Sequence, residues 1–253
     1  MLYVIICLVA FTASLLTFFS GFGLGTLLLP AFLFFFPPAE AILMTALVHF
    51  VNSIFKATLL FRSFDKLILL RFGLSALVGA VIGASTLIYF NSNGVLYTVL
   101  NRPVSSLSFI IGLLMIVFAI FEMIPKIAKF RMHNSAFIVG GLLSGFFGGL
   151  SGHQGAFRSM FLIKGGLSAV QFVATGTAIA LIVDFVRIPI YFFNSTQSWE
   201  EGDGSAILVG CVSAISGAYL GRKWLTKIEM KWIHFLVGIF IFSMGIGLLI
   251  GLL

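Results

Sequence analysis

The chain has 253 residues, of which 60% are hydrophobic and only 9% are charged, and its mean hydropathy is +1.16. Soluble domains carry about 25% charged residues, so this composition excludes a soluble protein and indicates an integral membrane protein. The formal net charge of +7 does not indicate nucleic-acid binding, because the basic residues gather in short connections between apolar segments, which is the pattern that orients membrane proteins.

Ten apolar segments follow one another along the chain, and many of them approach the roughly 20 residues that span a bilayer. They lie at 2–19, 23–36, 39–61, 67–90, 104–124, 134–150, 154–165, 168–193, 204–221 and 232–252. The first twenty residues lack the basic leader of a secretory signal, so we read them as a retained first helix. We expect an all-α membrane protein, a polytopic helical bundle with 8–10 segments embedded in the lipid bilayer.

Two glycine-rich stretches interrupt the apolar segments. The first is Ser20-Gly-Phe-Gly-Leu-Gly25, and the second and richer one runs from Ser144 to Met160 with a His, a Gln and an Arg. Glycine lets a helix unwind and exposes backbone amides to a solute, so we predict broken or re-entrant helices at both places. Whether 20–36 and 144–165 cross the membrane or re-enter stays open. The predicted backbone breaks are at Gly21, Gly23, Gly25, Gly148, Gly149, Gly152 and Gly155.

The charge of the connections predicts an orientation. Basic residues cluster near Arg62, Arg131 and Arg222, whereas the loop 194–203 holds three acidic residues and no basic one. The positive-inside rule then places the three basic connections in the cytoplasm and the N-terminus outside. With this orientation each half crosses the membrane an odd number of times, so the two halves have opposite topologies.

Weak internal matches support a duplication of the two halves. At a spacing of 130 residues, Ala39 matches Ala169 and Thr45 matches Thr175, and the start of each glycine-rich stretch reads Ser-Gly-Phe. We therefore predict two inverted repeats. The predicted division is 1–124 for the first transmembrane repeat, 125–133 for a cytoplasmic linker and 134–253 for the second repeat.

Ionisable residues inside apolar segments are the candidate site, because they are costly at membrane depth and usually face a cavity or a partner. In the first half, His49, Asn52, Ser53 and Lys56 have the spacing of one helix face. The candidates of the second half are Ser151, His153, Gln154, Arg158, Asp184 and Arg187. Basic groups together with half-helix N-termini predict an anion site.

Structural alternatives stand beside this interpretation. Lys56 lies near the end of its segment, where a lysine can extend to the membrane surface, and His49 can be a hydrogen-bonded packing residue. Asp184 and Arg187 are one turn apart, which fits a structural ion pair. The sequence holds no catalytic motif and no metal or nucleotide motif that we recognise, so we expect neither an enzyme nor a cofactor or metal.

At this point the sequence resembles the TauE/SafE sulfite exporter family. The resemblance rests on the stretch from Gly21 through Pro37-Pro-Ala39, the threonine-bearing helix from Thr45 to Arg62, the Gly145-Phe-Phe-Gly-Gly149 stretch, and Ala174-Thr-Gly-Thr177. It covers nearly the whole chain. The resemblance implies a plasma-membrane carrier of sulfite or small organosulfonates such as sulfoacetate, usually in the export direction.

We therefore expect a secondary transporter of a small anion that works by alternating access, with proton coupling through a histidine as one option. A passive anion channel and a non-transporting membrane subunit are the alternatives. The substrate, the direction, the coupling ion and the oligomeric state stay open, a homo-oligomer included.

Overall fold

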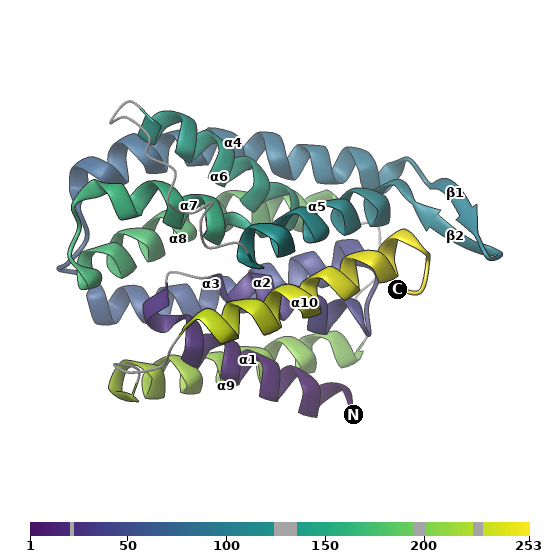
Figure 1. Cartoon of the computed structure of the whole chain (residues 1–253), viewed down its shortest axis with the longest axis horizontal. Coiled ribbons are helices and arrows are strands. Elements are labelled where there is room, and N and C mark those ends of the chain that lie inside the picture. Colours follow the sequence, from purple (N-terminus) through teal and green to yellow (C-terminus); the bar gives the residue numbers. More distant parts are fainter. Residues whose placement is uncertain (21–22, 124–135, 195–200, 225–229) are drawn as a thin grey trace.

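The computed structural model describes residues 1–20, 23–123, 136–194, 201–224 and 230–253, and these form ten α-helices and one β-hairpin (Figure 1). The first five helices are α1 (Leu2–Ser20), α2 (Leu24–Leu33), α3 (Pro38–Leu60), α4 (Lys66–Ser92) and α5 (Ser106–Met123). The second five are α6 (Ala136–Ser151), α7 (Gln154–Leu162), α8 (Ala169–Asn194), α9 (Glu201–Trp224) and α10 (Met230–Leu249). The expected linker 125–133 and Gly21 lie outside the described residues.

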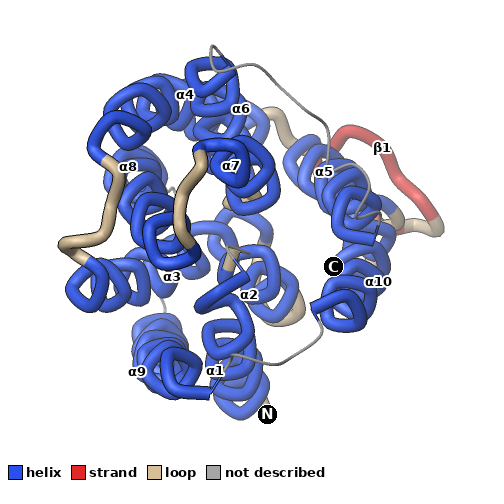
Figure 2. The backbone as a smooth tube through the Cα atoms, turned by 60° about the vertical axis from the view of Figure 1, so that its left-hand side comes forward, coloured by secondary structure: helices blue, strands red, loops and turns tan. Residues whose placement is uncertain are grey.

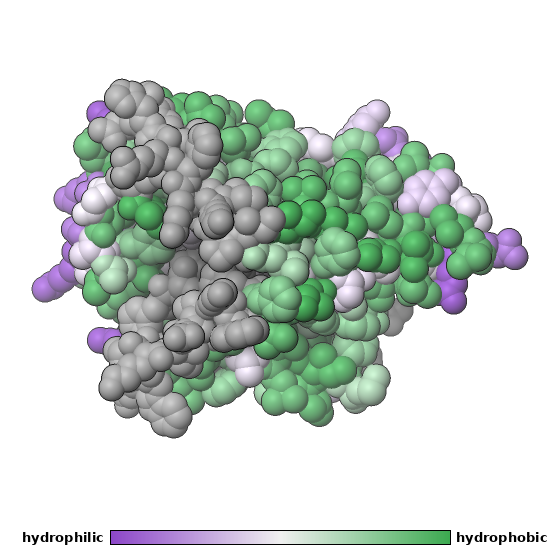
Figure 3. All heavy atoms as spheres, viewed as in Figure 1, coloured by the Kyte–Doolittle hydropathy of each residue, from purple (hydrophilic) through white to green (hydrophobic). Residues whose placement is uncertain are grey.

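The helices confirm a multi-pass membrane protein. Four of them are long and apolar enough to cross a bilayer, at Pro38–Leu60, Lys66–Ser92, Ala169–Asn194 and Asp203–Arg222, and five shorter helices are also apolar. In the coloured part of Figure 3, hydrophobic residues cover the middle of the molecule and hydrophilic residues gather at the two ends of its long axis. On this face the apolar band thus lies across the middle of the helices, where lipid contact requires it.

Three helix pairs form the outer part of the bundle. The most extensive contacts are between α4 and α6, between α1 and α9, and between α5 and α10, and Figure 2 shows these pairs at the outside with α2 and α7 between them. In the first pair, a Cβ on Gly83 would overlap the carbonyl oxygen of Phe146, and one on Gly145 would overlap that of Ala76. These glycines therefore allow the backbones of α4 and α6 to pack closely.

The second five helices follow the first five in the same order. If α1 to α5 correspond to α6 to α10, the contact between α4 and α6 corresponds to that between α9 and α1, and the contact of α4 with α8 to that of α9 with α3. The pairs α3–α8 and α5–α10 correspond to themselves. The pattern of helix contacts is thus the same when the first five helices are swapped with the second five: the α4–α6 contact takes the place of the α1–α9 contact, and the reverse.

Two of the helices are too short to cross the membrane. Helices α2 and α7 have 10 and 9 residues, which is about 15 Å or less at 1.5 Å per residue, against about 30 Å of hydrocarbon. Each follows a longer helix directly, α1 or α6, and then leads into a long one. The two glycine-rich stretches thus break the chain into a long helix and a half-length helix.

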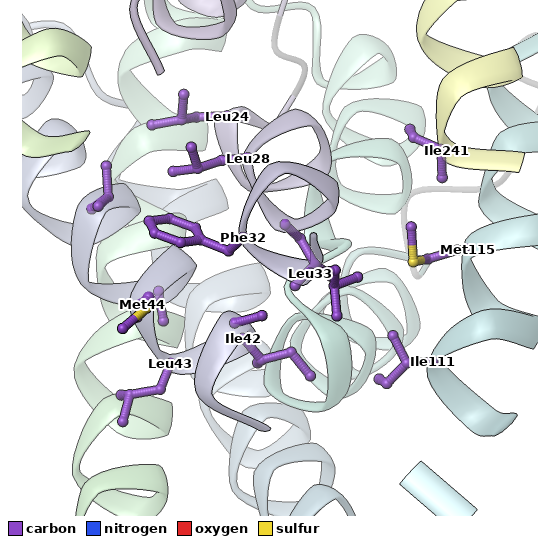
Figure 4. Packing of buried hydrophobic residues seen from close by; sticks show 14 of the residues in the cluster. Leu24, Leu28, Phe32, Leu33, Ile42, Leu43, Met44, Ile111, Met115 and Ile241 are labelled. Carbon is purple, nitrogen blue, oxygen red and sulfur yellow. The ribbon is translucent and has the colours of Figure 1, made fainter. Parts of the chain in front are cut away.

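An apolar core fills the part of the bundle around the C-terminal half of α2 and the start of α3. Leu28 and Phe32 of α2 pack there with Ile42 and Met44 of α3, all at most 1% exposed. Figure 4 shows these side chains together with Leu24, Leu33, Leu43, Ile111, Met115 and Ile241. Within the described residues, this cluster is the larger of the two apolar clusters.

A β-hairpin replaces part of the polar loop expected at 91–102. Strands β1 (Val95–Val99) and β2 (Arg102–Ser105) pair antiparallel, and the turn between them is formed by Leu100 and Asn101, both at positive φ. A two-residue turn with both residues at positive φ matches strand twist, but Leu100 gives no glycine signal for it. The Tyr97 hydroxyl donates to the Leu249 carbonyl at 2.7 Å, which ties the hairpin to the end of α10.

Candidate functional site

A polar cavity lies between α1, α2, α3, α7 and α8. It holds about 450 Å³ of space free of atoms, counted with its open mouth. Its lining includes the polar or charged residues Thr17, His49, Asn52, Ser53, Lys56, Arg158, Ser159 and Thr177. The lining residues come from the C-terminal half of α3 and the N-terminal half of α8, so the cavity lies in the half of the bundle nearer the connection 61–65.

The polar face predicted for α3 forms one wall of this cavity. His49, Asn52, Ser53 and Lys56 all line it and are at most 7% exposed. The Ser14 hydroxyl of α1 donates to Asn52 Oδ1 at 3.0 Å, which fixes the amide toward the interior. The spacing along the helix therefore predicts correctly which residues of α3 share the face that lines the cavity.

Two basic side chains from different helices line the cavity. Lys56 comes from α3 and Arg158 from α7, at 7% and 6% exposure, and the two groups interact electrostatically. Lys56 Nζ lies 5.5 Å from the centre of the Phe18 ring, while Arg158 NH1 is buried and has no hydrogen-bond partner among the described residues. Gly176 gives Arg158 room, because a Cβ there would lie 3.3 Å from its Nε.

Neither of these basic groups forms an ion pair with a carboxylate in the described part of the chain. Burying a charged group without a partner is unfavourable by several kcal/mol. Asp184 interacts electrostatically with Arg158 from outside the lining, and the lining itself holds Lys56 and Arg158 but no carboxylate.

Asp184 is held in a buried ion-pair network that joins α3 to α8. Its Oδ2 lies 2.6 Å from His49 Nδ1, and its Oδ1 lies 2.9 Å from Arg187 Nε and 2.8 Å from Arg187 NH2. His49 is 6% exposed, Asp184 is 0% exposed and Arg187 is 1% exposed. The expected ion pair between Asp184 and Arg187 is present, and His49 adds a contact between residues 135 positions apart. Asp184 and Arg187 do not line the cavity themselves; His49 connects them to it.

Arg187 also stabilises the break between α6 and α7. Its NH1 donates to the Gly148 carbonyl at 2.9 Å, and the Tyr191 hydroxyl donates to the Gly149 carbonyl. Both are among the last four carbonyls of α6, whose partners would lie beyond the end of the helix. The Gly148 carbonyl also accepts from the Gly152 N–H at 3.0 Å. Gly152 forms the break at φ +81°, and a Cβ there would lie 3.0 Å from Arg187 NH1, so glycine is needed both for the turn and for the space.

The N-termini of the two half-length helices meet. A Cβ on Gly23, the N-cap of α2, would lie 3.9 Å from Gly155 Cα in α7, and one on Gly25 would lie 3.5 Å from the Gly152 carbonyl oxygen. No side chain caps either N-terminus. Helix N-termini have free amides and a partial positive charge. The two predicted breaks are therefore parts of one region beside the cavity.

Ser151, His153 and Gln154 lie at this break, away from the cavity lining. The ring of His153 stacks on Phe118 of α5 with centroids 5.0 Å apart, and its Nδ1 is 3.1 Å from the Ser151 hydroxyl. His153 Nε2 and both polar atoms of the Gln154 side chain are buried without a partner among the described residues. In this structure the break does not bring the three predicted residues together with Lys56 and Arg158.

Thr17, Thr177 and Tyr191 were not among the predicted site residues. Thr17 and Thr177 line the cavity, and Tyr191 binds the α6 end. Thr177 belongs to the Ala174-Thr-Gly-Thr177 stretch that carries the family resemblance, and this stretch could have pointed to it as a site residue. Thr17 lies in an apolar helix, and no motif around it indicates a site. Among the residues that the structure describes, no group of three or more His, Cys, Asp or Glu could hold a metal ion.

Comparison with known families adds to this geometry. The sequence model of a family described as "Sulfite exporter TauE/SafE" matches residues 6–248. A comparison with curated proteins gives no match. The family match covers all ten helices except the first residues of α1 and the last residue of α10.

Proposed function

The chain belongs to the sulfite exporter TauE/SafE family, and on that premise we propose that it is a secondary transporter of a small anion, sulfite or an organosulfonate such as sulfoacetate. The observation that supports this substrate class is the pair Lys56 and Arg158, two buried basic groups that line one cavity and form no ion pair with a carboxylate in the described residues. An anion between them would supply the missing negative charge. Asn52, Ser53 and Thr177 are placed to add hydrogen bonds.

The proposed mechanism is alternating access between two inverted repeats. The exchange of helix contacts between α1–α5 and α6–α10 supports the repeats. The polar cavity occupies the half of the bundle near the connection 61–65, and the apolar core around Leu28, Phe32 and Ile42 fills the opposite part of α2 and α3. This difference between the two ends is what one of two alternating states would look like.

The orientation is also part of the proposal. The connection at the cavity end holds Arg62, and Lys66 and Arg71 follow in the first turns of α4, so the positive-inside rule places it in the cytoplasm of a plasma-membrane protein. The N-terminus is then outside and the cavity faces the cytoplasm, which suits an exporter. The proposal assigns no catalytic reaction to the chain, and it includes coupling of anion movement to proton movement.

Anion binding to purified protein tests the proposal. The unfolding temperature is measured with sulfite, sulfoacetate, taurine, sulfate, lactate and chloride. A ligand that binds only the folded protein stabilises it by about 2.7 kcal/mol at a hundred times its Kd, so we expect a clear upward shift with sulfite or sulfoacetate. Hydrogen bonds to charged groups contribute about 1.5–3 kcal/mol, so Arg158→Gln is expected to weaken binding roughly tenfold to a hundredfold.

Arg71→Gln is the matched control, because Arg71 is exposed on α4 and does not line the cavity. We expect it to bind like the wild type. A well-folded wild type that is stabilised by no anion would contradict the proposal and favour a non-transporting subunit. Anion flux into liposomes that rises without saturation would instead favour a channel.

A further inference from the structure

We propose that anion binding in this cavity is coupled to protonation of His49, so that a proton moves in the same direction as the anion. The inference rests on the proposed anion transport and adds the coupling ion, its residue and its direction. It is based on the position of His49, which lines the anion cavity and also contacts the buried Asp184.

The contact with Asp184 fixes which ring nitrogen can exchange a proton. A carboxylate only accepts hydrogen bonds, and Arg187 pairs with the other oxygen of Asp184. At 2.6 Å from Asp184 Oδ2, Nδ1 therefore has to donate and holds its hydrogen. Nε2 is then the ring atom that is left to gain or lose a proton.

The groups around His49 show how an anion would act on it. Asp184 and Arg187 face it from α8, with Tyr191 further along that helix, and Lys56 and Arg158 share the cavity with it. Helix α2 has no ionisable residue, and α1 has no Asp, Glu, Lys, Arg or His. On α9, which meets α3 where Gly210 approaches Val48, Asp203 and Arg222 lie near the two ends of the helix.

These charges give the coupling its sign. Asp184 and Arg187 offset each other, so a proton on Nε2 adds one positive charge to a cavity that already holds two basic groups. Without an anion, Lys56 and Arg158 oppose that charge; with an anion between them, the opposition is removed. Anion binding therefore favours the proton, and the proton favours the anion to the same extent.

Positive coupling of this kind loads the anion and the proton together and releases them together. The carrier would thus be a proton–anion symporter. During export, the outward gradient of the anion would then drive the proton outward with it. An antiporter requires the opposite, since one ligand must then displace the other.

The first test measures affinity and proton uptake with sulfite and with sulfoacetate, which has no group that titrates between about pH 6 and pH 8. Coupling between two sites is typically about fivefold to 150-fold. We expect the wild-type affinity to fall by a factor in that range as the pH rises from about 6 to about 8, with uptake of up to one proton per anion. In His49→Gln, which keeps an N–H donor for Asp184, the change should be less than about twofold.

Lys56→Arg identifies the residue, because arginine keeps the positive charge and does not titrate. Proton uptake that persists in Lys56→Arg and disappears in His49→Gln supports the inference. Uptake that disappears in Lys56→Arg and persists in His49→Gln would place the proton on Lys56 and overturn it. Loss of uptake in His153→Gln alone would overturn it too, because that histidine lies outside the cavity.

Flux into liposomes tests the direction with the wild type alone, even if His49→Gln does not fold. An acidic outside should speed the entry of labelled sulfoacetate or sulfite, and an alkaline outside should slow it. Anion binding or flux that is independent of pH would overturn this inference and leave the proposed transport standing. An absence of both binding and flux would instead contradict the proposed function itself.

Discussion

Arg187 is the residue on which the buried network depends most. It pairs with Asp184 through two nitrogens and donates to the Gly148 carbonyl through a third, at 1% exposure. Removing one member of a buried ion pair costs about 3–5 kcal/mol, because the other charge stays buried and unpaired. We expect Arg187→Met to lower the free energy of unfolding by that amount, measured by denaturant titration in detergent.

Two further variants separate the causes of this loss. Tyr191→Phe removes one hydrogen bond to the neighbouring Gly149 carbonyl and should cost only about 0.5–1.5 kcal/mol. The double variant Asp184→Asn with Arg187→Met removes both charges and should be more stable than Arg187→Met alone. A double variant no more stable than the single one would show that the cap on α6, and not the unpaired carboxylate, causes the loss.

At this scale the sequence predicted part of the site. The face of α3 with His49, Asn52 and Lys56 followed from helical spacing, and Arg158 stood out as a basic residue in an apolar stretch. The contact of His49 with Asp184 did not follow, because a periodic pattern describes one helix and not which helix it meets. Thr17 was missed for the same reason, and the positions of Ser151, His153 and Gln154 depended on how the chain turns after Gly152.

Backbone contact between α4 and α6 is the main interaction at the scale of the elements. A Cβ on Gly83 would overlap the Phe146 carbonyl oxygen and lie 2.9 Å from the Leu150 nitrogen. In an exposed helix, glycine to alanine stabilises by about 1 kcal/mol, but excess atoms in a packed contact cost about 1–3 kcal/mol. We therefore expect Gly83→Ala to lower the unfolding temperature.

Gly204→Ala is the matched control in α9, because no atom lies within 4 Å of a Cβ placed there. This substitution should leave the unfolding temperature unchanged or raise it slightly. Equal effects of the two substitutions would contradict the packing that we assign to Gly83.

The elements themselves were predicted well where apolar length and glycine define them. The observed α3 and α8 lie within a residue or two of the expected 39–61 and 168–193, and each half-length helix begins in a predicted glycine-rich stretch. Of the described glycines predicted as backbone breaks, only Gly23 and Gly152 lie between helices. The prediction was wrong for Gly25, Gly148, Gly149 and Gly155, which are helical; at Gly148 and Gly149, glycine instead allows close contact with neighbouring groups. The hairpin was missed, because its turn uses Leu100 and Asn101 at positive φ without glycine. Nothing in the local sequence distinguishes that turn from a polar loop.

For the whole molecule, the two halves share a layout but not their polar residues. At the spacing of 130, His49 and Lys56 correspond to Ile179 and Val186 of α8, while Asp184 corresponds to Ile54 of α3. The repeats that we propose would therefore have diverged so that each half supplies different groups: α3 supplies His49 and Lys56, and the second half supplies Asp184, Arg187 and Arg158. The site is complete only where the halves meet.

Labelling of single cysteines tests the orientation of the molecule. The chain ends and the hairpin lie at one end of the long axis, and the connection between α3 and α4 lies at the other (Figure 1). Because Arg62, Lys66 and Arg71 follow that connection, it should face the cytoplasm. In a chain without its natural cysteines, Asn101→Cys should react with an impermeant maleimide on intact cells, whereas Ser63→Cys should react only after permeabilisation.

The natural cysteines, Cys7 and Cys211, are both unpaired and partly buried, so their replacement by alanine is the background for both variants. Their parent without any cysteine controls for labelling elsewhere. The opposite pattern, with Ser63→Cys labelled on intact cells, would place the N-terminus inside and turn the cavity toward the outside. The cavity of this conformation would then take up its anion from outside the cell, which would favour import over export.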